Sequence, residues 1–316
     1  MGLYSAILIK HDMPNGRYLS EKALLYAPFF AFIVIVSGVI LLLPYDTVYV
    51  RDRTYLQLFL ATIVACTAVF FIGCLYNMLF WMHGKGLVSS PERRLLSSIA
   101  KALRLLFSRA FAKAVTVFLR DALYLAKLGS ISRTRWFMHL MILLGFALMF
   151  ALDIVVTLCL DVLEYGPMMD ESGWAKIWFR DIGFEVAGLM MLIGLSIAAV
   201  RRFVLKPDIV RTELPDAVSI VFLMAVVAGG FVLEAMGIAG TIPGHQENVE
   251  YSFVGYAISL ALPTSAGDLY DAAWLIHGIM SALLIAYIPF SKLFHMIASP
   301  IAIALDSALT QREVRH

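Results

Sequence analysis

Six long apolar segments dominate the pattern of hydrophobic and polar positions along this chain. They cover residues 23–43, 56–82, 136–160, 177–200, 217–239 and 274–300. Each is close to the roughly 20 apolar residues that a helix needs to cross a bilayer. The composition agrees, because 61% hydrophobic residues, 15% charged residues and a mean hydropathy of +0.83 exclude a soluble domain. We therefore predict an all-α, polytopic membrane protein with six transmembrane helices.

Positive charges are concentrated in two of the predicted loops. Residues 84–135 carry eleven lysines and arginines and residues 201–215 carry four, whereas residues 240–271 carry four carboxylates and no basic side chain. Cytoplasmic loops are enriched in lysine and arginine. This asymmetry predicts a multi-pass protein of the cytoplasmic membrane with both termini in the cytoplasm. The net charge of +2 is too small to indicate nucleic-acid binding.

The longest basic loop contains a predicted amphipathic helix. Ser90 followed by Pro91 is typical of a helix start. Beyond it, one face is apolar and the other is basic. Such a helix lies at a membrane surface. Two interpretations stay open, namely that it only rests on anionic lipid headgroups or that it also docks a cytoplasmic partner. The apolar face comprises Leu95, Leu96, Ile99, Leu103, Leu106, Phe107 and Ala110, and the basic face comprises Arg94, Lys101, Arg104, Arg109 and Lys113.

Two histidines lie within the last apolar segment, residues 274–300. His277 and His295 are 18 residues apart, which on a single α-helix is five full turns and about 27 Å along the axis. One imidazole would then lie near each membrane surface. Imidazole is a common axial ligand of haem iron, and ionisable residues inside a membrane are functional candidates. The pattern favours two stacked b-type haems, although either histidine could instead bond backbone groups or anchor at an interface.

A third histidine offers the first of these haems a second ligand. His139 lies near the start of the third apolar segment, at the depth predicted for His295. A low-spin b haem takes two axial donors, so we predict that these two histidines share one iron. Arg133, Arg135 and Lys292 are placed to bind the haem propionates. The alternative is that His139 only anchors its helix at the interface.

These features carry a resemblance to a known family. The relevant stretches are FLRDALYLAKLGSISRTRWFMHLMILLGF at residues 118–146 and WLIHGIMSALLIAYIPFSKLFH at residues 274–295. They resemble the cytochrome b family that includes the respiratory nitrate reductase gamma subunit, the cytochrome b of heterodisulfide reductase and DsrM-type membrane proteins. The likeness extends over about residues 118–300. It implies a quinone-reactive membrane protein bound to a cytoplasmic iron–sulfur protein.

The resemblance also implies how the ligands are divided. His139 and His295 match the pair that binds the haem on the cytoplasmic side, and His277 matches one ligand of the outer haem. In the gamma-subunit pattern the first ligand helix carries two histidines ten residues apart, whereas here the position ten after His139 is Met149. Met149 is therefore the candidate for the second outer ligand, with plain packing as the alternative. The remaining histidines are expected outside both sites: His83, His11, His245 and His316.

Three carboxylates fall in the outer third of their predicted helices. Asp153, Glu185 and Glu234 lie on three different segments, and charges at such depth are costly unless they are paired or functional. We predict that they exchange protons beside a quinone site. Arg180 lies just outside them and is a further candidate for a haem propionate. The alternative is an ion network around Arg180 that only ties these helices together.

The sequence therefore predicts four parts. Residues 1–90 form two transmembrane helices, residues 91–130 the interfacial helix and partner dock, residues 131–300 a four-helix bundle with two b haems, and residues 301–316 a cytoplasmic tail. The predicted function is electron transfer between menaquinone or another quinone and a heterodisulfide-reductase-like iron–sulfur protein, within a larger complex of anaerobic respiration. The competing class is a haem-free membrane scaffold or transporter that uses the same polar residues.

Overall fold

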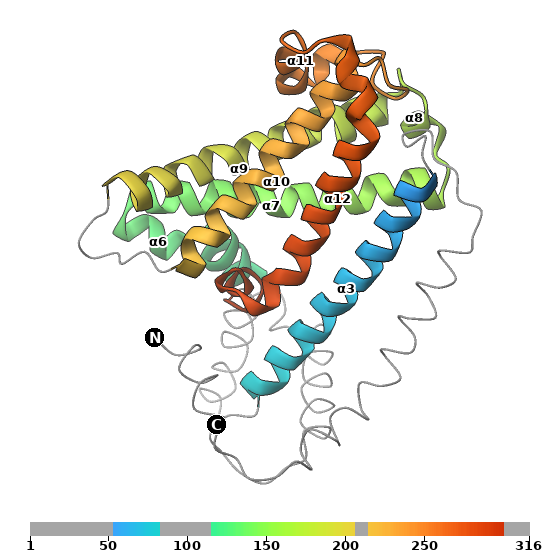
Figure 1. The fold of residues 1–316 in the computed structure, drawn as a ribbon. Helices are drawn as coiled ribbons and strands as arrows, with labels where there is room; N and C mark the ends of the chain where they lie inside the picture. The colour runs from blue at the N-terminus through green and yellow to red at the C-terminus, as the bar shows by residue number, and fades with distance from the viewer. Residues whose placement is uncertain (1–52, 83–114, 206–213, 300–316) are drawn as a thin grey trace, which may run out of the picture.

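The computed structural model describes residues 53–82, 115–205 and 214–299 (Figure 1). These residues form helices and no strand, which confirms the predicted all-α class. Five of the helical segments are long and apolar enough to cross a membrane, so the chain is a multi-pass membrane protein. The first predicted span, residues 23–43, and most of the predicted interfacial helix lie outside the described residues, so the count of six helices stays a prediction.

Five helices form the described bundle, and shorter helical segments extend or connect them. The five are α3 (Arg53–Met82), α7 (Arg133–Thr157), α9 (Gly183–Ala199), α10 (Leu214–Ala239) and α12 (Tyr270–Tyr287). The shorter segments are η2 (Phe118–Leu123), α6 (Ala126–Ile131), η3 (Leu158–Val162), α8 (Gly166–Met169), η4 (Lys176–Ile182), η5 (Val200–Leu205), η6 (Val249–Tyr251), α11 (Phe253–Ser259), η7 (Thr264–Leu269), η8 (Ile288–Phe290) and η9 (Lys292–Phe294).

Two helix pairs and one central helix make up the bundle. Helix α7 packs along α9, α12 packs along α3, and α10 touches both α9 and α12 (Figure 1). Glycines allow α7 and α9 to approach closely, because a Cβ added at Gly145 would lie 2.8 Å from the carbonyl oxygen of Ala187 and one at Gly194 would lie 2.9 Å from that of Met138. Small residues at such contacts are typical of membrane helices.

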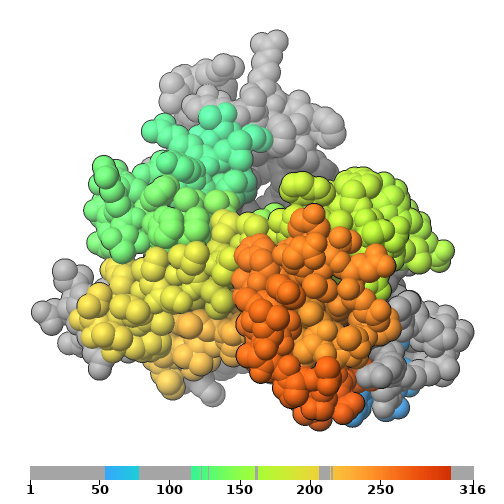
Figure 2. Space-filling view, turned by 90° about the horizontal axis from the view of Figure 1, so that it is seen from above, coloured from blue at the N-terminus to red at the C-terminus, as the bar shows by residue number. Residues whose placement is uncertain are grey.

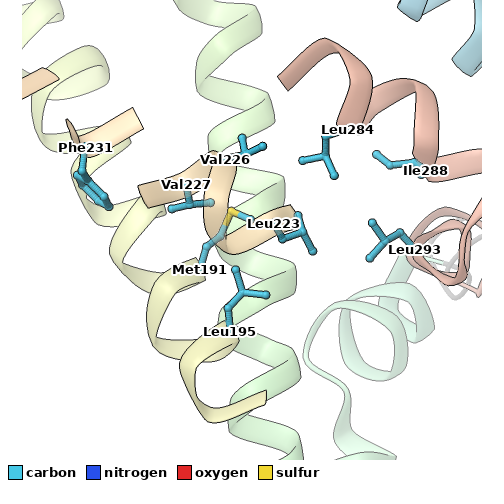
Figure 3. Packing of buried hydrophobic residues seen from close by; sticks show 9 residues of the cluster. All are labelled: Met191, Leu195, Leu223, Val226, Val227, Phe231, Leu284, Ile288 and Leu293. Carbon is cyan, nitrogen blue, oxygen red and sulfur yellow. The ribbon is translucent and has the colours of Figure 1, made fainter. Parts of the chain in front are cut away.

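The buried core lies where α9, α10 and the last span meet. Side chains from these helices point toward one another there (Figure 3). All are aliphatic, aromatic or thioether groups, so the centre of the bundle is held by apolar packing. The cluster comprises Met191, Leu195, Leu223, Val226, Val227, Phe231, Leu284, Ile288 and Leu293.

The last predicted span is not one continuous α-helix. Helix α12 ends at Tyr287, two short 3₁₀ turns follow, and α-helix resumes at residues 295–299. Pro289 explains the break, because it lacks a backbone N–H. Ser291 then takes an extended conformation, and its Oγ accepts a hydrogen bond from the backbone N–H of Leu293. The prediction that His277 and His295 lie on one face of a single helix is therefore wrong.

The loops at the far end of α10 pack on the segment before η4. The carboxylate of Glu171 accepts hydrogen bonds from the backbone N–H groups of Gly244, Gln246 and Glu247 at 2.9, 3.2 and 3.1 Å. In the view from above, atoms coloured yellow-green and orange for these two regions lie beside each other (Figure 2). This contact joins the α10–α11 connection to the α8 region.

Candidate functional site

A cavity of about 260 Å³ opens where the break after α12 meets α7, α9 and α10. Its walls are mostly apolar, and its polar groups include His139 of α7 and His295, which follows η9. The structure thus brings together the two histidines that were predicted to share an iron, although they are far apart in the chain. We call this region the paired-histidine end. The apolar lining includes Met138, Ile142, Leu143, Leu195, Leu223, Leu293 and Met296.

Both histidines of this cavity are held in the same tautomer. Nδ1 of His139 lies 2.8 Å from the carbonyl oxygen of Arg135, and Nδ1 of His295 is bonded to the carbonyl oxygen of Lys292. A carbonyl oxygen only accepts, so each Nδ1 donates its proton and each Nε2 keeps a lone pair. Metal-binding histidines are usually fixed by this kind of backbone bond. Each ring is therefore prepared to bind a metal through Nε2.

Three charged side chains form an ion cluster on the wall of the same cavity. The carboxylate of Asp216, at the start of α10, lies 2.6 Å from Nη1 of Arg202 and 2.9 Å from Nζ of Lys292. All three residues line the cavity. Of these three, only Lys292 is predicted as a site residue from the sequence. Arg202 counts there among the basic residues of the loop at residues 201–215, and the one signal for Asp216 is its position just after Pro215 at a helix start.

The other predicted propionate ligands lie elsewhere. Arg133 and Arg135 are exposed in the first turn of α7, and neither is among the residues that line the cavity. Arg180 lies at the opposite end of the bundle, close enough to Asp181 and His245 to interact with them electrostatically. The ion pair in its segment joins Lys176 to Asp181 at 3.0 Å, with both side chains buried. This pair lies within η4 and does not bridge helices.

His277 lies in a different environment, which we call the single-histidine end. Its ring faces α10 at two consecutive glycines, since a Cβ at Gly229 would lie 3.3 Å from Nδ1 and one at Gly230 would lie 3.5 Å from Cε1. Nδ1 is buried and has no hydrogen-bond partner among the described residues. Buried polar atoms are normally satisfied. The environment is therefore consistent with a histidine that binds something further.

Met149 contributes to the core. It is partly buried on α7 and packs against the cluster of buried side chains between α9, α10 and the last span. This placement agrees with the packing alternative. It does not test the predicted role of Met149 as an axial ligand, which stays a prediction.

Two of the three predicted carboxylates meet at the single-histidine end. Glu185 is buried, and its two carboxylate oxygens accept the backbone N–H groups of Val254 and Gly255 at 2.9 and 3.1 Å. Glu234 on α10 is hydrogen-bonded to Glu185 and to Ser252. A bond between two carboxyl groups needs one proton, so this pair holds at least one.

Asp153 is not part of this pair and is exposed on α7. The sequence predicts the level of each acid along its helix, but not the direction in which its side chain points.

His245, which the sequence predicts to lie in a loop outside both haem sites, is partly buried there. Nε2 of His245 lies 3.2 Å from the hydroxyl of Tyr270, and the ring fills the space beside Gly237. Burial, together with the nearby Arg180 and Lys176 cations, lowers the pKa of His245 to about 3. The imidazole is therefore neutral at physiological pH. Only the tertiary contacts reveal the burial, and no pattern in the sequence indicates it.

Glu171 is also held in its charged form. Burial alone would raise the pKa of Glu171, but the three backbone N–H groups outweigh that effect and lower it below its usual value. The contact between the loops therefore depends on a carboxylate at Glu171.

The paired-histidine end fits a haem better than a small metal cluster. No group of three or more His, Cys, Asp or Glu side chains gathers as a metal site within residues 53–82, 115–205 and 214–299. A six-coordinate haem iron needs only two axial donors, an apolar cavity for its ring and cations for its propionates. The cavity supplies two Nε2 lone pairs, an apolar wall, and Arg202 and Lys292.

Comparisons with known proteins show two kinds of similarity. The model of the nitrate reductase gamma subunit family matches residues 167–313, a segment that contains His277 and His295. One of the dihydromethanophenazine:CoB–CoM heterodisulfide reductase subunits of Methanosarcina acetivorans is 27% identical over 79% of this chain and 91% of its own length. Its counterpart in Methanosarcina barkeri is 27% identical over 80% and 92%. No solved structure matches the chain.

The resemblance predicted from the sequence is thereby confirmed. The match to the gamma-subunit family covers the last helices, and the heterodisulfide reductase relatives extend it over about four fifths of the chain. The chain is thus similar in part to the nitrate reductase gamma subunit family and over most of its length to a heterodisulfide reductase subunit.

Proposed function

We propose that this chain is the cytochrome b subunit of a membrane oxidoreductase complex and carries electrons between a quinone and an iron–sulfur partner. The observation that carries the proposal is the pair formed by His139 and His295, which line one cavity with both Nδ1 atoms bonded to backbone carbonyls. Two imidazoles prepared in this way suit the two axial positions of one iron. A bound b haem would supply one-electron transfer.

The residues of the cavity have separate roles in this proposal. His139 and His295 would hold the iron of a bound haem, and the apolar wall would keep water from its ring. Arg202 and Lys292 offer the propionates a cationic surface that Asp216 partly neutralises. Arg133 and Arg135, exposed at the start of α7, remain candidates only for propionates that reach the surface.

A second b haem is proposed at the single-histidine end. His277 is one ligand, and the proposal is supported by its buried Nδ1, which has no hydrogen-bond partner among the described residues. Met149 is the proposed second ligand, because methionine and histidine together are known ligands of haem iron. Arg180 would serve the propionates of this haem, on the side of the bundle where His245 lies.

Quinone chemistry is proposed at the same end. Quinol oxidation releases protons, so the site needs groups that accept and pass them. The hydrogen-bonded Glu185 and Glu234 hold at least one proton where α9, α10 and α11 meet. Because Glu185 is fixed by two backbone N–H groups, Glu234 is the better candidate for the group that moves a proton. Asp153 is proposed as a further exchange group on α7.

The partner is proposed to be a heterodisulfide-reductase-like iron–sulfur protein at the cytoplasmic face, where further members of the complex and the anionic lipid surface also meet the chain. The relatives are named as components of a heterodisulfide reductase, and the predicted basic helix within residues 91–130 offers a dock. Both termini would lie on this side. The proposed division into residues 1–90, 91–130, 131–300 and 301–316 follows from that orientation.

Reduction of the purified protein by a quinol analogue tests the proposal. We expect a b-type α band to appear on quinol addition and to be reoxidised by an added iron–sulfur partner. A chain that binds quinol but shows no α band after chemical reduction would instead be a scaffold or transporter, the competing class.

A further inference from the structure

The segment that interrupts the last span is bonded to side chains of two other helices. Residues 288–294 contain the two short turns η8 and η9 and lead directly to His295. A free chain segment of this kind would leave the histidine poorly oriented. Two side chains from other helices, Asn77 and Asp216, are bonded to it.

The first contact comes from α3. Nδ2 of Asn77 donates a hydrogen bond of 2.6 Å to the carbonyl oxygen of Pro289. One turn earlier, Gly73 allows the helices to touch, because a Cβ there would lie 2.6 Å from Cβ of Pro289 and 2.9 Å from the ring of Phe290. Such a Cβ would force the segment away from α3. Helix α3 therefore holds the break at the position of its proline.

The second contact comes from the start of α10. Asp216 is buried, and one of its carboxylate oxygens lies 2.9 Å from Nζ of Lys292, while the other bonds Arg202 in η5. The backbone carbonyl of the same Lys292 accepts the Nδ1 proton of His295. Lys292 thus contacts Asp216 through its side chain and His295 through its backbone carbonyl.

We propose that Asn77 and Asp216 are positioning residues that together orient His295 and fix its tautomer. This inference rests on the proposed function, because the orientation matters for a ligand. Asn77 is not among the residues that line the cavity, and its effect passes through the backbone of residues 289–295. Asp216 acts through Lys292. The contacts of Asn77 and Asp216 are independent of each other, since Asn77 is a neutral side chain on α3 and Asp216 is a charged side chain on α10.

Matched pairs of variants separate positioning from charge and from loss of fold. Asn77→Leu removes the amide without a change of charge, and its control is Thr62→Val, because the Thr62 hydroxyl bonds the carbonyl of Leu58 within α3. Asp216→Asn removes the carboxylate, Asp216→Glu restores it, and the control is Asp268→Asn, an exposed acid in η7 before the start of α12.

Two readouts apply to the purified full-length chain, namely the affinity measured by titrating haem into haem-depleted protein and the low-spin EPR signal of the loaded protein. Loss of the groups that orient a metal ligand typically weakens metal binding about 10- to 100-fold. We expect such a loss, with a shifted largest g value, in both Asn77→Leu and Asp216→Asn. Asp216→Glu, Thr62→Val and Asp268→Asn should resemble the wild type.

A double variant tests the route through Lys292. If Asp216 acts by holding Lys292, the g-value shift of Asp216→Asn should add little in a Lys292→Met background, whereas separate effects would add. Wild-type affinity and g values in Asn77→Leu and Asp216→Asn would overturn the inference, and a change in only one of them would overturn the joint role of the two contacts. Failure of the proposed function looks different, because the wild-type protein itself would then bind no haem.

Discussion

At one end of the bundle, His139 and His295 each donate Nδ1–H to a backbone carbonyl and share one cavity. At the other end, His277 faces Gly229 and Gly230, and its buried Nδ1 has no partner among the described residues. The first pair is oriented by the backbone of the chain, whereas the second histidine has a polar atom that a ligand could satisfy. The ends also differ in how they treat charge.

Charges at the paired-histidine end line the cavity. Arg202 and Lys292 share the carboxylate of Asp216, and Asp121 also lines the cavity. Toward the other end of the bundle, polar groups bond one another, as in the contact between Glu185 and Glu234 and the contact of His245 with Tyr270. Two cations thus face the cavity at one end, whereas a hydrogen-bonded pair of carboxyl groups lies at the other.

The largest expected effect is loss of one haem from the paired-histidine end. Replacing either His139 or His295 by alanine removes one of two axial donors, so the remaining site binds haem weakly or holds it in a high-spin state. Haem content and the low-spin EPR signal of each variant measure this. Unchanged content and spectra in both single variants would show that the two histidines are structural.

The second prediction concerns His277. His277→Ala should remove one haem and leave the signal of the paired-histidine end intact, because the two sites share no ligand. Met149→Leu should change the spectrum of the same haem if methionine is its second ligand, and Leu fills a similar volume in the core. Magnetic circular dichroism of the loaded protein identifies the ligands, and a second bis-histidine signature would exclude Met149.

A third prediction separates the two glutamates. Glu234→Gln should slow haem reduction by a quinol analogue by roughly 100-fold, the lower range for loss of an acid–base group, without a change in the haem spectra. Glu185→Gln should mainly destabilise the protein, because Glu185 accepts the N–H groups at the start of α11. Stopped-flow reduction and thermal unfolding measure the two effects. Equal rates of haem reduction in Glu234→Gln and wild type would show that the pair of Glu185 and Glu234 is only structural.

The smallest effect is a pH dependence of stability from His245. The pKa of His245 is about 3 in the folded chain and about 6.5 when unfolded, so the unfolded state binds more protons between these values. Stability is then full above about pH 6.5 and falls by up to about 1.4 kcal/mol for each pH unit below it. Thermal unfolding in detergent at several pH values measures the slope, which His245→Gln should reduce.

The helices were predictable because hydropathy and length decide them. Residues 56–82, 136–160, 177–200 and 217–239 each correspond to a helical segment, and the meeting of His139 with His295 followed from their depth. The break in residues 274–300 was less visible, since the segment stays apolar throughout and only Pro289 marks it. Hydropathy shows only that a segment is apolar. The break involves the absent backbone N–H of Pro289 and a hydrogen bond from Asn77, which lies more than 200 residues away.

The polar contacts between distant segments could not be predicted. Asp216, His245 and Glu171 acquire their roles from tertiary contacts with Lys292, Tyr270 and the backbone of residues 244–247. No local pattern in the sequence indicates such pairs. Asp153 shows the converse, because its depth could be predicted from the sequence while its exposure on α7 could not.

The central claim is that His139 and His295 hold one b haem between them. The most direct test is the low-temperature EPR spectrum of the purified full-length protein, recorded beside His139→Ala and His295→Ala with haem quantified in each sample. The account predicts a bis-histidine low-spin signal in the wild type that disappears from both variants. A wild-type protein without haem, or a bis-histidine signal that survives in both variants, would contradict it.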